Sequence, residues 1–331
     1  MQDAARPAAR GRPDANSTEL YAVPRQVAGV EECMFYHTMD LPGHGTVQGI
    51  WDLRDRWAEY LGGVELRGKR VLELGSASGD VCFFMERQGA EVVAFDLAPD
   101  RLWDFVPSPR LENPSEYLRR GFTFFKRLHN SYWFAHRAHR SRARVVHGGI
   151  YEVPGEIGPV DICTYGCILL HLRDPFLALA NGLRLTRERV IITQPLHGRS
   201  WESTVMGRAS AAPPVSRRFV RKAVRRLLNV FRSVAVPVSA APAEMVPCMA
   251  FLPDHHVLAG VGGEVLEQHI TCWRFLTPQA VQQMVGCLGF ERSRLTYHEQ
   301  LFNGRPHAMY TLVADRTQPM PARIDGPFPW Y

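Results

Sequence analysis

The 331-residue chain lacks the features that mark several large classes of protein. It has seven cysteines, an odd number, and no C-x-x-C pair, so we expect neither a disulfide framework nor a zinc knuckle. No apolar run approaches the ~18 residues of a transmembrane helix. The N-terminus is rich in Ala, Arg and Pro and has no apolar core of the signal-peptide kind. These absences predict reduced thiols, no transmembrane segment and a cytoplasmic location.

Signatures of metal and nucleic-acid binding are also weak. The pair His255-His256 stands alone, without an H-x-x-x-H motif or clustered carboxylates, so we expect no metal. The net charge of +6 at pH 7 gathers in two clusters, at 119–144 and 217–232, and does not cover a face. Residues 137–144 could follow an RNA backbone or form a solvated helix end, so nucleic acid is possible but not favoured as a partner.

Short apolar runs alternate with helical patterns from residue 67 onward. The strand-like runs are 71–74, 91–95, 145–147, 160–165 and 189–193, and the helical patterns between them include 80–89 and 175–185. This alternation predicts a doubly wound, mostly parallel α/β sheet. A late helix at 277–288 and two strands, at 294–297 and 309–314, predict an antiparallel closure. We expect seven strands with an antiparallel strand at the edge, together with an N-terminal cap and helical insertions.

Composition divides the chain further. The expected segments are a disordered tail (1–18), an N-terminal cap (19–66), the α/β core (67–200) with a helical insertion (100–144), an insertion or lid (201–270), the end of the core (271–315) and a C-terminal tail (316–331). Residues 53–61 of the cap have helical spacing. Residues 217–232 form a basic amphipathic pattern, which predicts a helix packed on the domain or a peripheral contact with a membrane surface.

A small-residue loop follows the first strand of the core and opens the next helix. Gly75 and Gly79 bound this loop, where free backbone N–H groups and the helix dipole meet and glycine permits close approach. The spacing is not G-x-G-x-x-G, so an anionic pyrophosphate is not the expected guest. Asp96 follows the second strand, where a carboxylate can accept both hydroxyls of a ribose.

The run Glu73-Leu74-Gly75-Ser76-Ala77-Ser78-Gly79 resembles motif I of the class I S-adenosylmethionine (SAM)-dependent methyltransferases, and the resemblance covers residues 69–193. It implies that Glu73 approaches the amino group of the cofactor and that Asp96 holds the ribose. Ala77 stands where the family usually has glycine, and Gly149 where it usually has an acid. The implied cofactor-binding residues are Glu73, Gly75, Ser76, Ala77, Gly79, Asp96, Leu97, Gly149, Ile150 and Tyr165. A plain α/β turn and a nicotinamide dehydrogenase are the alternatives.

Residues 161–175 support the same resemblance, because they read as the fourth strand of the family followed by H-L-R-D-P at 171–175. Pro175 suits the first turn of a helix. The segment also resembles the bacterial tRNA wobble-uridine carboxymethyl-group transferases, which have a basic N-terminal arm that is little evident here. We therefore favour a small-molecule acceptor, in natural-product or sugar biosynthesis, over a tRNA.

Methyl transfer requires positioning, desolvation and, for some acceptors, a base. His171, which follows the fourth strand at the carboxyl edge of the sheet, is the first candidate, with a structural role as the alternative. His37 and Tyr36 come next, because the cap could close over the cofactor. Weaker candidates are His44, His197 and His269, and Trp51, Trp133 and Trp273 either line the acceptor pocket or pack in the core.

The sequence thus predicts a SAM-dependent methyltransferase. A tRNA-modifying methyl- or carboxymethyltransferase and a non-catalytic module that retains the fold are the alternatives. The acceptor atom and the oligomeric state stay open.

Overall fold

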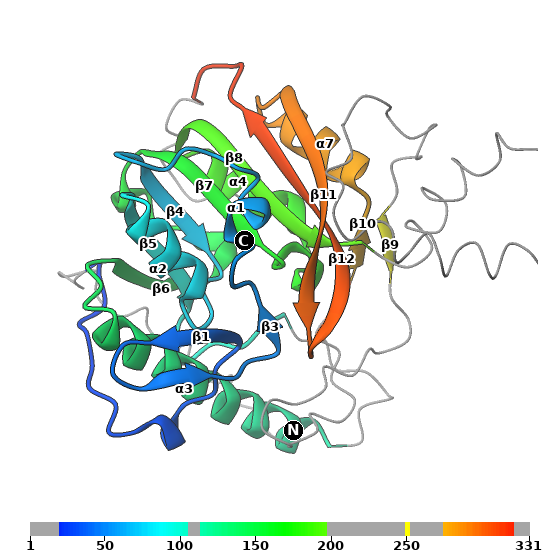
Figure 1. The fold of residues 1–331 in the computed structure, drawn as a ribbon. Coiled ribbons are helices and arrows are strands. Elements are labelled where there is room, and N and C mark those ends of the chain that lie inside the picture. The colour runs from blue at the N-terminus through cyan, green and yellow to red at the C-terminus, as the bar shows by residue number, and fades with distance from the viewer. Residues whose placement is uncertain (1–19, 105–112, 197–248, 252–273, 321–331) are drawn as a thin grey trace, which may run out of the picture.

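A computed structural model describes residues 20–104, 113–196, 249–251 and 274–320, and Figure 1 draws the rest as a grey trace. Several expectations therefore lie outside the described residues. They concern the tail at 1–18, the basic helix at 217–232, most of the insertion at 201–270, most of the C-terminal tail, and the residues His197, His255, His256, His269 and Trp273.

A ten-stranded sheet forms the centre of the described structure, in the order β2-β1-β3-β11-β12-β8-β7-β4-β5-β6 (Figure 1). Its core is a run of parallel strands made of buried apolar residues: β4 (Arg70–Leu74), β5 (Glu91–Leu97), β6 (Arg144–Gly148), β7 (Val160–Gly166) and β8 (Thr186–Pro195). Helices connect them, as parallel pairing requires. The expected α/β class, with a mixed and mostly parallel sheet, is confirmed.

The predicted count of seven strands was wrong because the N-terminal segment joins the sheet. Its strands are β1 (His37–Leu41), β2 (Gly45–Val47) and β3 (Trp51–Asp52), and β3 pairs antiparallel with β11 (Arg292–Phe302). The predicted place of the antiparallel strand was also wrong. β12 (Arg305–Asp315) runs antiparallel to both of its neighbours, and it lies inside the sheet between β8 and β11. The edges are β2 and β6.

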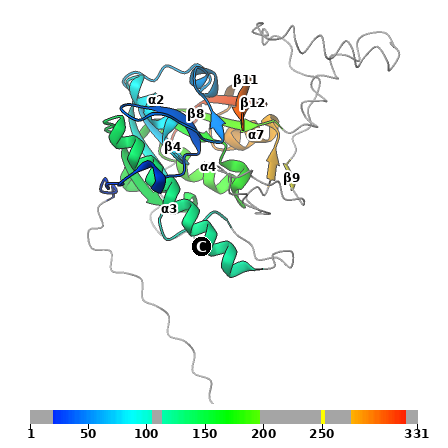
Figure 2. The same ribbon diagram turned by 60° about the horizontal axis from the view of Figure 1, so that its bottom comes forward.

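Helices cover both faces of the sheet. One face packs against α2 (Asp80–Arg87), the second half of α3 (Pro114–Ala138) and the N-terminal segment. The other face packs against α4 (Pro175–Leu183) and α7 (Pro278–Cys287). Figure 2 shows α3 running out beyond the sheet. The insertion at 100–144 thus contains one long helix, whereas only four residues of the stretch 53–61 are helical, as α1 (Trp57–Tyr60).

The strand order places a crevice at the carboxyl ends of β4 and β7. From β4 the chain moves outward to β5 and β6, and it then returns to the opposite side of β4 to form β7 and β8. Ligands of open α/β sheets bind where the order reverses in this way. The remaining described elements are η1 (Val30–Glu32), η2 (Ile150–Glu152), η3 (Gly155–Ile157), η4 (Leu169–His171) and the pair β9 (Met249–Phe251) and β10 (Arg274–Leu276).

Candidate active site at the strand-order reversal

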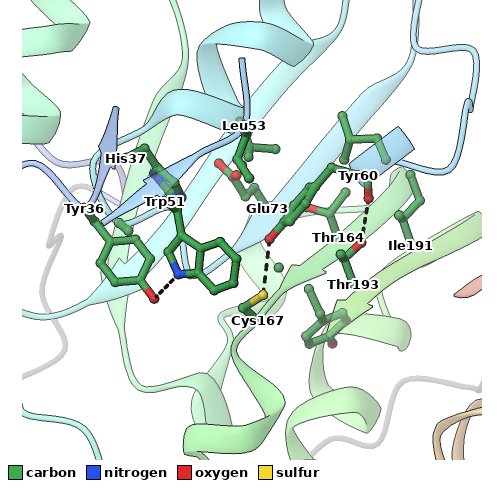
Figure 3. Close-up of a pocket in the computed structure, with 16 residues that line it drawn as sticks. Tyr36, His37, Trp51, Leu53, Tyr60, Glu73, Thr164, Cys167, Ile191 and Thr193 are labelled. Atoms are coloured by element: carbon green, nitrogen blue, oxygen red, sulfur yellow. Dashed lines mark hydrogen bonds between the residues drawn. The ribbon is translucent and has the colours of Figure 1, made fainter. Parts of the chain in front are cut away.

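A pocket opens at the carboxyl ends of β4 and β7, beneath the N-terminal cap (Figure 3). Aromatic and apolar side chains of the cap and of α1 face polar groups of the strands. The sixteen lining residues are Tyr36, His37, Trp51, Leu53, Tyr60, Leu61, Glu73, Gly75, Ala77, Val81, Thr164, Tyr165, Gly166, Cys167, Ile191 and Thr193. The pocket therefore joins the glycine loop to two of the three predicted catalytic candidates, Tyr36 and His37.

The loop from Gly75 to Gly79 turns through three left-handed residues. The φ angles are +87° at Gly75, +49° at Ala77 and +89° at Gly79. This conformation is open to glycine but costs a residue with a Cβ about 1–2 kcal/mol. Ala77, which stands where the family usually has glycine, is thus under backbone strain on the wall of the pocket.

Asp96, at the end of β5, is hydrogen-bonded to this loop. Its Oδ2 accepts from the backbone N–H of Ala77 at 2.6 Å and from the hydroxyl of Ser76 at 3.3 Å, and its Oδ1 accepts from the N–H of Leu97 at 2.7 Å. Burial raises the pKa of Asp96, and these hydrogen bonds oppose the rise. Because each carboxylate oxygen has two lone pairs, the held carboxylate can still accept from a ligand.

The hydrogen bonding of Glu73, at the end of β4, differs from that of Asp96. Its side chain is 5% exposed, and among the described residues its Oε2 has no hydrogen-bond partner. Burial raises the pKa of Glu73 well above its usual value, and the negative charges of Asp96 and Asp80 add to the rise. A buried polar group without a partner is costly, so Glu73 is a natural point of attachment for a ligand that donates hydrogen bonds.

His37 ties the cap to the glycine loop. Its backbone N–H donates to Ser78 Oγ at 3.0 Å, and its Nδ1 lies 3.2 Å from the same oxygen. Burial lowers the pKa of His37 to about 4, so the imidazole is neutral at pH 7. Nearby, the indole Nε1–H of Trp51 donates to the Tyr36 hydroxyl at 3.2 Å (Figure 3).

The sequence did not single out the Cys167 and Tyr60 pair, on the far side of the pocket. The Tyr60 hydroxyl donates to Cys167 Sγ at 3.7 Å, and Cys167 has a left-handed backbone with φ +51°. Thr193 Oγ1 fixes Tyr60 by donating to its carbonyl at 2.6 Å. The only sequence signal for Cys167 was its place directly after a strand, at the ligand-binding edge.

Three other candidates lie outside the pocket lining. His171 is half-buried in η4, and His44 lies in the exposed turn after β1, with its ring 4.8 Å from that of Phe134. Trp133 is 3% exposed in the core. Tyr165 borders the pocket, yet its hydroxyl donates to carbonyls of α4, at 3.0 Å and 3.2 Å, on the opposite face of the sheet.

The other predicted cofactor residues gather at the ends of β5 and β6. Leu97 pairs with Gly148, which brings it beside Gly149 and Ile150. The Arg101 guanidinium lies against Gly149, where a Cβ would strike it, and forms an ion pair with Glu152 at 3.0 Å. Within the described ranges, no three metal-ligating side chains gather, and no helix is long and apolar enough to cross a membrane.

No protein-family model and no curated protein matches the sequence. Among solved structures, many SAM-dependent methyltransferases match at low identity. The N-terminal domain of EvdMO1, in the presence of SAH (S-adenosylhomocysteine) and D-fucose, is 14% identical over 87% of this chain and 93% of its own, with a TM-score of 0.45.

The 1,6-didemethyltoxoflavin-N1-methyltransferase of Burkholderia thailandensis is 14% identical over 80% of this chain and 78% of its own, with a TM-score of 0.41. Magnesium protoporphyrin IX methyltransferase of Synechocystis PCC 6803 is 11% identical over 79% and 80%, with a TM-score of 0.37.

Proposed function

We propose that this protein is a SAM-dependent methyltransferase that acts on a small-molecule acceptor. One observation carries the proposal: a left-handed glycine loop and the carboxylate that it holds, Asp96, lie at the strand-order reversal beside the buried carboxyl of Glu73. Asp96 can accept from ribose hydroxyls, the loop allows close backbone approach, and Glu73 can pair with an amino group. These three features lie close together.

The residues present fit this cofactor. Asp96 would hold the ribose, Gly75 and Gly79 leave room for the chain that joins ribose to amino acid, and Glu73 would face the amino group. Leu97, Gly149 and Ile150 would border the adenine. When bound, the cofactor supplies an electrophilic methyl group, so the protein's own part is to orient the acceptor and exclude water.

His37 is the residue that we assign to the acceptor. It lines the pocket, is neutral at pH 7, and has its Nδ1 bound to Ser78, which leaves Nε2 to contact the group that is methylated. Tyr36 and Trp51, on the same cap, would shield that group from water. His171 lies outside the lining, and we give it no contact with the acceptor.

Two conservative variants test this assignment. Asparagine can place a polar atom near the Nδ1 position and keep the Ser78 contact, whereas glutamine reaches nearer to Nε2. We expect His37→Asn to fold with unchanged SAH affinity and to lose at least tenfold in kcat, with His37→Gln less impaired. Equal activity of His37→Asn and the wild type would reduce His37 to a structural role.

The charges favour a small acceptor over RNA. The sixteen described residues of the lining include no lysine or arginine. In the basic run at 137–144, Arg144 pairs with Glu91 at 2.6 Å and Arg142 lies 4.0 Å from Glu86. These ion pairs reduce the positive charge that would attract a phosphate backbone.

Calorimetric titration with SAH tests cofactor binding. We expect saturable binding with one site per chain, and Asp96→Ala should weaken it at least tenfold, or about 1.4 kcal/mol. The matched control is Asp100→Ala, since Asp100 is an exposed aspartate of the same segment, and it should bind as the wild type does. A folded wild-type protein that shows no saturable binding would overturn the proposal.

A further inference from the structure

A tyrosine–cysteine contact in the pocket has a counterpart in the core of the protein. In the pocket, the Tyr60 hydroxyl donates to Sγ of the half-buried Cys167 at 3.7 Å (Figure 3). In the core, the Tyr132 hydroxyl lies 3.5 Å from Cys82 Sγ, and both side chains are buried. Tyr60 and Cys167 belong to the lining of the pocket, whereas Tyr132 and Cys82 do not, so a ligand in the pocket can reach the first pair.

The Tyr60 hydroxyl is a donor whose partner is a weak acceptor. Sulfur accepts hydrogen bonds weakly, whereas a buried tyrosine hydroxyl usually finds a good partner. Tyr60 is 5% exposed, and burial raises the pKa of its hydroxyl well above the usual value, so the hydroxyl keeps its proton at pH 7. An oxygen atom of a ligand would therefore be a better partner for Tyr60 than the thiol is.

Neighbouring residues hold Tyr60 in this position. Its carbonyl accepts hydrogen bonds from Thr193 Oγ1 at 2.6 Å and from Thr311 Oγ1 at 3.1 Å, and both threonines are buried. A Cβ at Gly166 would lie 2.5 Å from the Tyr60 hydroxyl, so the glycine makes room for this hydroxyl at the end of β7. The donor is thus in place before a ligand binds, which lowers the cost of binding.

Thr164 adds a second polar atom to the same strand end. It lines the pocket and is 3% exposed, and among the described residues its Oγ1 has no hydrogen-bond partner. Thr164 lies two residues before Gly166 in β7, so both positions face the same side of the sheet. Because a buried polar atom without a partner is costly, this side of the pocket suits a ligand that carries an oxygen.

The cap side of the pocket is aromatic and apolar. The Trp51 indole packs against Phe302, with the ring centroids 4.7 Å apart, and its N–H donates to the Tyr36 hydroxyl at 3.2 Å. Since the N–H has its partner, Trp51 offers a ligand its ring surface. Leu53 and Leu61 are buried aliphatic neighbours in the same lining. Such a wall packs well against a flat aromatic ring.

The charges of the pocket restrict the ligand further. The described lining contains no lysine or arginine, and its histidine, His37, is neutral at pH 7. A carboxylate or phosphate on the acceptor would therefore find no positive partner there and would meet the carboxyl of Glu73. Burial of an unpaired charge is costly, so the lining disfavours an anionic acceptor.

We propose that the acceptor is an uncharged aromatic compound, and that the Tyr60 hydroxyl donates a hydrogen bond to a hydroxyl or carbonyl oxygen that it carries besides the methylated group. The inference rests on the proposed function and names the substrate class of the same site. The aromatic ring lies against Trp51, and the ligand oxygen takes the hydrogen bond that Cys167 accepts in the free pocket. Tyr60 is thereby a specificity-determining residue that the sequence did not single out.

Three small probes with the same ring test the substrate class. p-Cresol carries a hydroxyl and is uncharged at pH 7, p-toluate carries a carboxylate, and toluene carries neither. Each is titrated into the protein saturated with SAH, and binding is followed by ligand-detected NMR. We expect p-cresol to bind saturably, toluene to bind about fivefold more weakly for want of one hydrogen bond, and p-toluate to bind at least tenfold more weakly than p-cresol.

Tyr60→Phe tests the residue, because it keeps the ring and removes the donor. We expect this variant to bind p-cresol about fivefold more weakly and to keep the wild-type affinities for toluene and SAH. The matched control is Tyr132→Phe, which removes the hydroxyl of the tyrosine–cysteine contact in the core. That variant should bind p-cresol, toluene and SAH as the wild type does.

The outcomes distinguish this inference from the proposed function. If SAH binds but p-cresol does not, or if p-toluate binds as tightly as p-cresol, the inference is overturned and the methyltransferase proposal stands. Equal losses of p-cresol and toluene in Tyr60→Phe would also overturn the inference, because they would report general damage to the pocket. A wild-type protein that does not bind SAH would overturn the proposed function, and the inference with it.

Discussion

Asp80, the first residue of α2, should make the stability of this protein fall as the pH rises toward neutral. Its side chain is 3% exposed and accepts a hydrogen bond from Trp57 Nε1 at 2.7 Å. Burial raises the pKa of Asp80 from 3.8 to about 7, against the opposing effects of Trp57, Arg87 and Arg54.

The sign follows from proton linkage. Because the pKa of Asp80 is higher in the folded than in the unfolded chain, the folded protein binds this proton more tightly. The stabilisation is therefore complete below about pH 4 and is lost as the pH rises to about 7. A pKa difference of about 3 corresponds to about 4 kcal/mol of the free energy of unfolding.

Asp80→Asn removes the ionisation and keeps an oxygen that can accept from Trp57. Relative to the wild type, we expect the variant to gain up to about 4 kcal/mol at pH 8 and to differ little at pH 4. Urea unfolding followed by circular dichroism between pH 4 and 9 measures both. Trp57→Phe is the companion variant, since removing the donor should raise the pKa of Asp80 further and extend the loss to higher pH. Parallel pH profiles for Asp80→Asn and the wild type would refute the reasoning.

Three further substitutions test the local physics of the fold, each by urea unfolding. Ala77→Gly should stabilise the protein by about 0.5–1 kcal/mol, because it relieves a left-handed alanine at the cost of some unfolded-state entropy, and a loss of stability would contradict that strain. Gly79→Ala should cost about 2 kcal/mol or more, since its Cβ would lie 2.6 Å from the Phe83 ring at φ +89°, and a neutral result would argue against this loop conformation. Asp174→Ala should cost about 1 kcal/mol, because Asp174 Oδ1 accepts from the N–H of Leu177 at 2.9 Å as the N-cap of α4, and an unchanged midpoint would remove this cap.

Local patterns predicted the segment that binds the cofactor in our proposal. An apolar run ended by glycine predicted β4, and the small-residue loop that Gly75 and Gly79 bound predicted the turn that opens α2. Because the carboxyl ends of parallel strands share one edge, the same reasoning placed Asp96 beside the loop, where the structure has it. The roles of Glu73 and Asp96 toward a cofactor stay predictions.

These local patterns could not predict the pairing of strands that lie far apart in the sequence. β3 is two residues long, and it joins the sheet by pairing Asp52 with Leu301, which lie at opposite ends of the chain. The sequence around neither residue indicates this pairing, so the cap was expected beside the sheet and not within it. Residues 53–61 have helical spacing, but only α1 forms within them.

The site shows the same limit. Thr164 is a polar residue in a mostly apolar strand. Its hydroxyl has no hydrogen-bond partner among the described residues because distant segments bury it, and no local pattern reveals that burial. His171 was singled out for its place after β7. The chain first passes through the left-handed Cys167 and then forms η4, and His171 lies outside the lining.

A crystal structure of the protein with SAH tests the central claim most directly. We predict that the ribose hydroxyls lie within hydrogen-bond distance of Asp96, that the amino group faces Glu73, and that the sulfur faces the side of the pocket formed by His37 and Tyr36. SAH bound away from the loop at 75–79, or with its ribose out of reach of Asp96, would contradict the account.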